Sequence, residues 1–101
     1  MSAERLDEAA IAARTAGLRW SRDGDSLVTT RRFDGFPAAV AFVVRVAFLA
    51  EQRRHHPDIT ISYNRVGLRL TTHDAGGITA ADVDLAAAVD ALEAGATGAG
   101  D

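Results

Sequence analysis

The spacing of hydrophobic residues along the chain first follows the period of an α-helix. Apolar residues recur at three- and four-residue intervals over residues 4–13, which predicts a short helix that Ser2 caps and Gly17 ends. A longer helix is predicted from Pro37, a residue tolerated in the first turn, to about Arg54. This helix has two apolar stripes, one of Val40, Val44 and Ala47 and one of Phe42, Val46 and Leu49. A helix that is apolar on two sides is usually covered on both, which indicates an oligomer.

A third helix is predicted after a capping box formed by Thr79 and Asp82. Its inner face would carry Leu85, Val89 and Leu92. Gly95 would end this helix. Residues 96–101 are then expected to form a disordered tail on a domain of residues 1–95.

Alternation of apolar and polar residues predicts four strands in two hairpins. The first hairpin would turn at residues 23–24, an Asp-Gly pair that is a strong two-residue turn signal. It would join an extended segment beginning at Trp20 to a strand over residues 26–33. The resulting cross-strand pairs are Arg22 with Asp25 and Trp20 with Leu27.

The second hairpin is predicted to turn at residues 64–65, between strands over residues 59–63 and 66–71. The core-facing pairs would be Tyr63 with Val66, Ile61 with Leu68, and Ile59 with Leu70. A slip of one residue would set apolar against polar positions, so the alternation supports this register. Extended outward, the same register places His56 opposite His73.

Together these elements run α-β-β-α-β-β-α in a single α+β domain. The expected architecture is a four-stranded antiparallel sheet with three helices on one face. A length of 101 residues suits one small domain, and 48% hydrophobic residues suit a packed core.

Charge and composition exclude several classes of function. All 11 basic residues are arginine, but the net charge is −3, so a nucleic-acid partner is not expected. The chain has no cysteine, which excludes disulfides, thiolate chemistry and Cys-based zinc sites. Residues 1–8 are polar, and the longest apolar run, residues 40–50, contains Arg45 and is too short to span a bilayer. We therefore expect a cytoplasmic protein without a membrane partner.

All three histidines, His55, His56 and His73, lie in one stretch with the carboxylates Glu51 and Asp82. Zinc would favour a helical histidine pair four residues apart, so no metal is expected. Glu51 has two open interpretations, a solvated residue at a helix end or a partner of His55 one turn later. Asp82 also has two, a helix cap or a member of a site. Because imidazole can both accept and donate a proton, the set as a whole favours proton-transfer chemistry.

The spacing within this stretch is highly specific. It is Glu51-x3-His55-His56-Pro57, followed by Tyr63, His73 and Asp82. The flanking residues agree with it, namely Trp20, the segment 33–36, Tyr63-Asn64, Thr72-His73-Asp74 and Gly77-Ile78-Thr79. This pattern resembles the pterin-4a-carbinolamine dehydratase family, and the resemblance covers nearly the whole chain.

The resemblance implies that the protein dehydrates a 4a-hydroxytetrahydropterin to quinonoid dihydropterin, a step in tetrahydropterin recycling. His55 and His73 would form the acid/base pair, His56 would mainly hold the pterin, and Glu51 and Asp82 would orient the imidazoles. The substrate-binding residues would be His55, His56, Pro57, Thr72, His73, Asp74 and Ala75. No cofactor and no metal are implied, and members of the family form homodimers or homotetramers.

The family also has non-catalytic members, which serve as dimerisation partners of a transcription factor or as assembly chaperones. If this chain were one of them, its binding surface would be the stripe of Phe42, Val46 and Leu49. Such members often lose the histidines, whereas this chain keeps all three. Two residues depart from the pattern, since Ile59 replaces a frequent aromatic residue and Arg54 a frequent acidic one. Either change could alter which pterin is preferred.

Overall fold

The secondary-structure elements follow the predicted order. The computed structural model describes residues 4–100. Its elements are α1 (Glu8–Thr15), β1 (Ser21–Asp23), β2 (Ser26–Arg32), α2 (Phe36–Arg53), β3 (Asp58–Ser62), β4 (Arg65–Leu70), a 3₁₀ turn (His73–Ala75) and α3 (Ala80–Gly100). The predicted α+β class and the α-β-β-α-β-β-α order are therefore confirmed.

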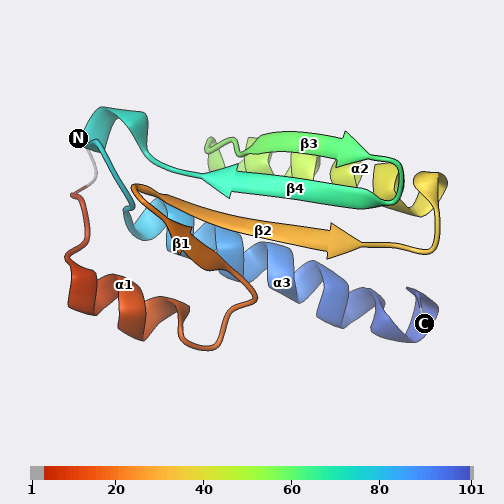
Figure 1. The fold of residues 1–101 in the computed structure, drawn as a ribbon, viewed down its shortest axis with the longest axis horizontal. Helices are drawn as coiled ribbons and strands as arrows, with labels where there is room; N and C mark the ends of the chain where they lie inside the picture. The colour runs from red at the N-terminus through yellow and green to blue at the C-terminus, as the bar shows by residue number, and fades with distance from the viewer. Residues whose placement is uncertain (1–3, 101) are drawn as a thin grey trace.

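The two hairpins join edge to edge into one antiparallel sheet with the strand order β1-β2-β4-β3. The central pair is β2 with β4, in which Leu27 lies opposite Leu70. Figure 1 shows α2 behind β3 and β4, while α3 passes behind β1 and β2. The short helix α1 packs beside α3, where Arg14 donates a hydrogen bond to Asp84 at 2.9 Å.

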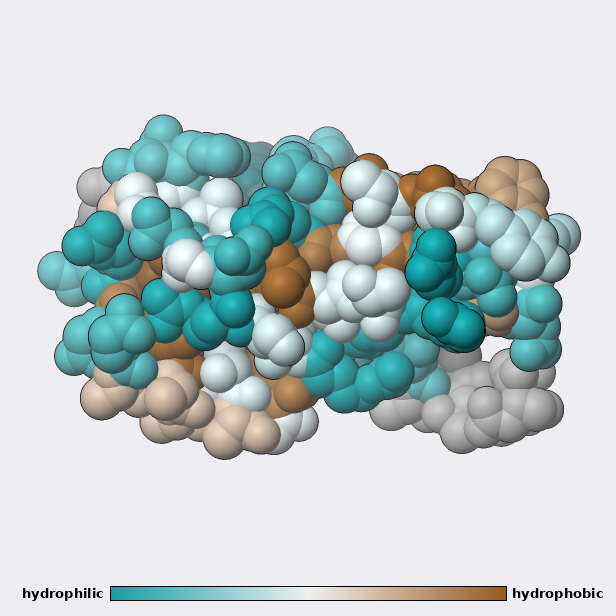
Figure 2. All heavy atoms as spheres, in the orientation of Figure 1, coloured by the Kyte–Doolittle hydropathy of each residue, from teal (hydrophilic) through white to brown (hydrophobic). Residues whose placement is uncertain are grey.

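The core lies between the sheet and the helices. Its largest buried apolar residues include Leu27, Leu70, Ile78, Leu85, Val46, Val66 and Val89. The other face of the sheet carries polar residues such as Arg69, which forms an ion pair with Asp23 at 2.5 Å. Figure 2 shows that this face is mostly hydrophilic or neutral. Among residues 4–100, no helix is both long enough and apolar enough to span a membrane.

A buried ion cluster fastens α3 to the sheet. Arg31 points from β2 into the core and is only 1% exposed. Its guanidinium forms ion pairs with Asp90 and Glu93 on α3. It also lies 5.7 Å from the ring centroid of Trp20, whose indole N–H donates to Asp90 at 3.0 Å. Because a buried charge must be paired to be tolerated, these partners make the position of Arg31 possible.

The first helix begins later than predicted. Its cap is Asp7, whose Oδ1 accepts a hydrogen bond from the N–H of Ala10 at 2.8 Å, while Ser2 lies outside the described residues. The residues before Asp7 are extended, because the N–H of Leu6 donates to the Ile78 carbonyl oxygen at 2.8 Å. The helix ends at Thr15 with a right-handed cap, so the predicted left-handed cap at Gly17 is also wrong.

The first hairpin turns one residue later than predicted. Asp23 lies opposite Ser26, so the central residues of the turn are Gly24 and Asp25, and Arg22 lies opposite Leu27. Only the first of these, Gly24, takes a positive φ, of 60°. Glycine at the first central position is typical of a type II′ turn, which explains why the Asp-Gly pair does not form the turn centre.

The second hairpin is shifted by two residues from its predicted register. Ile61 lies opposite Val66 and Ile59 opposite Leu68, which makes residues 63–64 the turn. Asn64 fixes this turn, because it exchanges hydrogen bonds with Phe33 through its side chain at 2.9 Å and its carbonyl oxygen at 2.8 Å.

Two predictions fail with this register. Tyr63 occupies the turn with a φ of 55° and is 68% exposed, so it is not a core residue. His56 does not lie opposite His73, because both residues are outside the paired strands.

The helix α2 buries the stripe that was predicted to be a binding surface. Phe42 and Val46 are at most 2% exposed, so the prediction that they form a binding surface is wrong. The exposed large apolar residues of α2 are Phe36, Val44 and Phe48. The helix therefore does carry apolar residues on two sides. The side with Phe42 and Val46 faces the core, and the side with Val44 is the exposed one.

The predicted capping box of α3 is confirmed. Asp82 accepts a hydrogen bond from the N–H of Thr79 at 2.8 Å, and the Thr79 hydroxyl accepts one from the N–H of Ala81 at 3.2 Å. The helix continues past Gly95, where we expected it to end, to Gly100. Disorder of residues 96–101 in solution stays a prediction.

Candidate functional site

The end of α2 sends the two neighbouring histidines in different directions. Arg54 adopts a left-handed conformation with φ of 53°, and the N–H of His55 donates to the Ala50 carbonyl oxygen at 3.1 Å. These two features define a Schellman-type end, which stops the helix three residues before Pro57. As a result the His55 side chain is only 16% exposed, whereas the His56 side chain is 65% exposed.

The left-handed Arg54 gives a direct test of this helix end. A side chain costs roughly 1 kcal/mol in this conformation, so Arg54→Gly should stabilise the protein by up to about 1 kcal/mol. The matched control is Arg53→Gly, which places glycine inside the last turn and should destabilise by about 1 kcal/mol. Urea unfolding curves measure both. Equal losses for the two variants would show that Arg54 does not end the helix as described.

A buried carboxylate holds His55. Asp82 is 0% exposed, and its Oδ1 lies 2.5 Å from Nε2 of His55. Its Oδ2 accepts hydrogen bonds from the Thr72 hydroxyl at 2.7 Å and the Thr79 N–H at 2.8 Å. Asp82 thus caps α3 and belongs to the site at once, so both interpretations of this residue apply.

The hydrogen bonds of this network fix the direction of each donor. Thr72 gives its only hydroxyl proton to Asp82, so the hydroxyl of Thr79 must donate to Thr72 across their 2.8 Å contact. A carboxylate only accepts, so Nε2 of His55 is the nitrogen that carries the proton. In the neutral imidazole, the other ring nitrogen of His55, Nδ1, then has a free lone pair.

His73 stands on a small closed loop between β4 and α3. The loop is closed by paired backbone hydrogen bonds between Thr72 and Gly77, at 3.0 and 3.3 Å. Gly76 adopts φ of 74° and its N–H donates to the His73 carbonyl oxygen at 3.1 Å. Within residues 4–100 the His73 imidazole makes no hydrogen bond, so among polar contacts only those of the loop backbone help to place it.

The three histidines line one cavity of about 330 Å³. Its lining residues are Arg54, His55, His56, Thr71, Thr72, His73 and Asp74. Five predicted site residues are thus brought together, whereas Pro57 and Ala75 do not line this cavity. Asp82 reaches it through His55, and Glu51 through His56 at 3.0 Å, so the predicted contact of Glu51 with His55 is wrong.

Three residues of the site were not predicted from the sequence. Arg54 and Thr71 line the cavity, and Thr79 joins the hydrogen-bond network behind it. The capping box pointed to Thr79 as a helix cap, and the same spacing could have identified its link to Asp82. Arg54 stood out in the sequence only as a departure from the family pattern, and its left-handed conformation was not predictable, since arginine is not a typical left-handed residue.

This arrangement can carry out proton transfer. Two imidazoles share a cavity, one held by a buried carboxylate and one with no hydrogen-bonding partner among the described residues. Such a pair can take a proton from one atom of a bound molecule and give one to another. No three His, Cys, Asp or Glu side chains within residues 4–100 form a group that could hold a metal ion.

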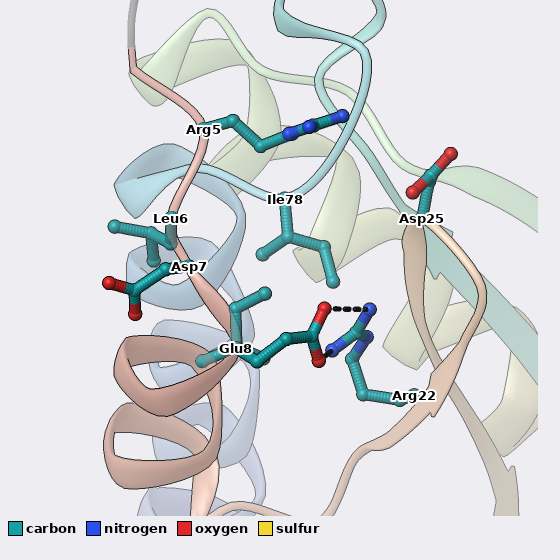
Figure 3. A pocket seen from close by; sticks show the side chains of 8 residues that line it. Arg5, Leu6, Asp7, Glu8, Arg22, Asp25 and Ile78 are labelled. Atoms are coloured by element: carbon teal, nitrogen blue, oxygen red, sulfur yellow. Dashed lines mark hydrogen bonds and ion pairs between the residues drawn. The ribbon is translucent and has the colours of Figure 1, made fainter.

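A second hollow, of about 400 Å³, lies between the N-terminal segment with the start of α1, the first hairpin and Ile78. Figure 3 shows that Glu8 and Arg22 close one part of it with an ion pair, at 2.7 Å. The hydrogen bond from the Arg22 guanidinium holds the pKa of the Glu8 carboxyl below its usual value. None of the three histidines lines this hollow.

The fold is that of a known structural class. The chain superposes on the crystal structure of a transcriptional coactivator/pterin dehydratase from Brucella melitensis with a TM-score of 0.84 and 29% identity, covering 88% of this chain and 98% of that one. A pterin dehydratase-like protein identified as a RuBisCO assembly factor in the alpha-carboxysome gives a TM-score of 0.60 and 28% identity, covering 74% and 87%.

The family model described as "Pterin 4 alpha carbinolamine dehydratase" matches residues 4–92. The chain therefore belongs to the pterin-4a-carbinolamine dehydratase family. A relative from Chloroflexus aurantiacus is 57% identical over 87% of this chain and 96% of its own. One from Thermomicrobium roseum is 60% identical over 81% and 89%. Both are provisionally named pterin-4-alpha-carbinolamine dehydratases.

Proposed function

We propose that the protein is an active dehydratase that removes water from a 4a-hydroxytetrahydropterin and returns quinonoid dihydropterin for reuse. The observation that carries this proposal is the pair formed by His55 and His73. They line the same cavity, and a buried carboxylate holds the first of them in a defined tautomer. Membership of the family supports a pterin as the substrate.

The geometry suggests a role for each histidine in the elimination. Nδ1 of His55 would take the proton from N5 of the pterin, since Nε2 is committed to Asp82. A protonated His73 would give its proton to the hydroxyl on C4a. The C4a–O bond then breaks, water leaves, and a double bond forms between C4a and N5. Exchange with solvent would restore both imidazoles. His56, backed by Glu51, would hold the pterin at the outer rim.

The direct test is the decay of a 4a-hydroxytetrahydropterin, followed by its ultraviolet absorbance with and without the protein. The proposal requires a faster decay in the presence of the protein, in proportion to its concentration. Equal decay in both samples would overturn it.

The non-catalytic alternative has less support. The relatives of known structure include proteins described as a coactivator and as an assembly factor. The surface predicted for such a role, around Phe42 and Val46, is buried. This chain also keeps all three histidines. A stable partner captured equally well by the unchanged protein and by His73→Ala, in a protein without dehydratase activity, would reverse this preference.

A homodimer or homotetramer in the cytoplasm completes the proposal. Phe36, Val44 and Phe48 expose apolar side chains on α2, and Phe48 is 72% exposed. A second copy of this chain could cover such a face. Phe48→Glu is expected to lower the mass measured by light scattering by at least one half. Thr30→Glu, on the polar face of the sheet, should leave it unchanged. A monomeric unchanged protein would remove this part of the proposal.

A further inference from the structure

The segment before α1 lies across the loop that carries His73. The N–H of Leu6 donates to the carbonyl oxygen of Ile78 at 2.8 Å, and Arg5 forms an isolated antiparallel bridge with Thr79. These contacts add a short extended segment to the end of the loop, although the two segments are about 70 residues apart in the sequence. The N-terminal segment therefore belongs structurally to the site region.

The Arg5 side chain grips the loop in two ways. Its Nη1 donates a hydrogen bond to the carbonyl oxygen of Gly76 at 3.2 Å. Its aliphatic stem covers Gly77, where an added Cβ would lie only 2.5 Å from Cδ and 3.1 Å from Cγ of Arg5. Figure 3 shows that Arg5 points away from the ion pair of Glu8 and Arg22, toward the loop. Gly77 is buried as a result.

The contacts of Arg5 bear on His73 because that imidazole has no hydrogen bond of its own among residues 4–100 and depends on the loop for its position. The loop is closed by Thr72 and Gly77, and Gly76 bonds back to His73. Arg5 touches two of these four residues. We infer that Arg5 is a positioning residue that holds the His73 loop in the geometry the reaction needs. The consequence for the rate rests on the proposed function, whereas the consequence for the position of His73 does not.

The Arg5→Ala variant is expected to lower kcat by about 10-fold with little change in KM, because a small displacement of an acid/base group costs turnover more than binding. Arg5→Lys keeps the stem and a donor, and should recover most of the loss. The matched control is Arg14→Ala, which removes an exposed arginine of α1 that contacts Asp84 and not the loop. Its kcat should equal that of the unchanged protein.

Gly77→Ala displaces Arg5 by a different route. The backbone of Gly77 is not in the left-handed region, and the atoms that an added Cβ would meet belong to the flexible Arg5 side chain. The variant should therefore fold and should lose kcat to about the same extent as Arg5→Ala. Because both changes break the same contact between Arg5 and the loop, the double variant should lose no more kcat than either single variant. Additive losses would contradict this coupling.

A measurement without substrate separates this inference from the proposed function. The imidazole of His73 should change its NMR signals in Arg5→Ala and Gly77→Ala, while the signals of His55, held by Asp82, stay in place. If the unchanged protein does not dehydrate a pterin, the proposed function fails, and the His73 signals still decide whether Arg5 positions the loop. Unchanged His73 signals in both variants would overturn the inference.

Discussion

The His73→Ala variant is expected to dehydrate a 4a-hydroxytetrahydropterin roughly 10²-fold or more slowly than the unchanged protein, the usual contribution of a general acid or base. Since the His73 imidazole makes no hydrogen bond within residues 4–100, its removal should leave the free energy of unfolding nearly unchanged. The variant thus separates chemistry from folding. Initial rates of absorbance change at saturating pterin, together with a urea unfolding curve, measure both quantities.

His55→Ala should reduce the rate by a similar factor. Unlike His73, however, His55 also pairs with the buried carboxylate of Asp82. Its loss leaves Asp82 buried with only the hydrogen bonds from Thr72 and Thr79. We therefore expect an additional cost to stability of about 1–3 kcal/mol.

His56→Ala is the control for both variants, because this ring is 65% exposed and pairs with the exposed Glu51. Removing it should raise KM more than it lowers kcat. A full rate in either His55→Ala or His73→Ala would exclude the proposed acid/base pair.

The second large effect is expected on stability, at Arg31. Arg31→Met keeps most of the buried apolar volume but removes the charge that pairs with Asp90 and Glu93. Breaking a buried ion pair from one side typically costs 3–5 kcal/mol. The two carboxylates are partly exposed, at 16% and 22%, and can recover some hydration, so we expect about 3 kcal/mol.

The control for Arg31→Met is the same change at Arg69. Arg69 pairs with Asp23 on the open face of the sheet, where the two side chains are 43% and 61% exposed. Such surface pairs contribute at most about 1 kcal/mol. Denaturant unfolding, with equal slopes for all samples, gives the difference. If Arg31→Met proved no more costly than Arg69→Met, the ion cluster would not be what fastens α3 to the sheet.

The fold was predictable because its local signals agree with one another. Periodicity and turn signals indicated the order of the helices and strands, and the capping box located the start of α3 at Thr79. The pairing registers of the two hairpins were harder to predict from the sequence. A shift of two residues keeps Ile59 and Ile61 on the same face, so alternation cannot detect it. The deciding contact is the bond between Asn64 and Phe33, which joins distant segments.

The site was predictable in its members but not in its geometry. The spacing of the motif brought together the three histidines and the two carboxylates. It could not show which carboxylate serves which histidine, because that depends on the left-handed Arg54. This turn aims His55 at Asp82 and leaves Glu51 to His56. The start of α1 was missed for a similar reason, since a bond from Leu6 to Ile78 overrides a local helical pattern.

Asp82 and His73 differ in how much the fold depends on them, and this difference predicts how the family would change if catalysis were no longer under selection. Asp82 starts a helix as well as holding an imidazole, so its loss would be selected against even in a protein without activity. His73 does not stabilise the fold in this way and would be the first of the two to be replaced by other residues. When relatives are sorted into enzymes and binding proteins, a retained Asp82 should therefore be a poor marker of activity and a retained His73 a good one.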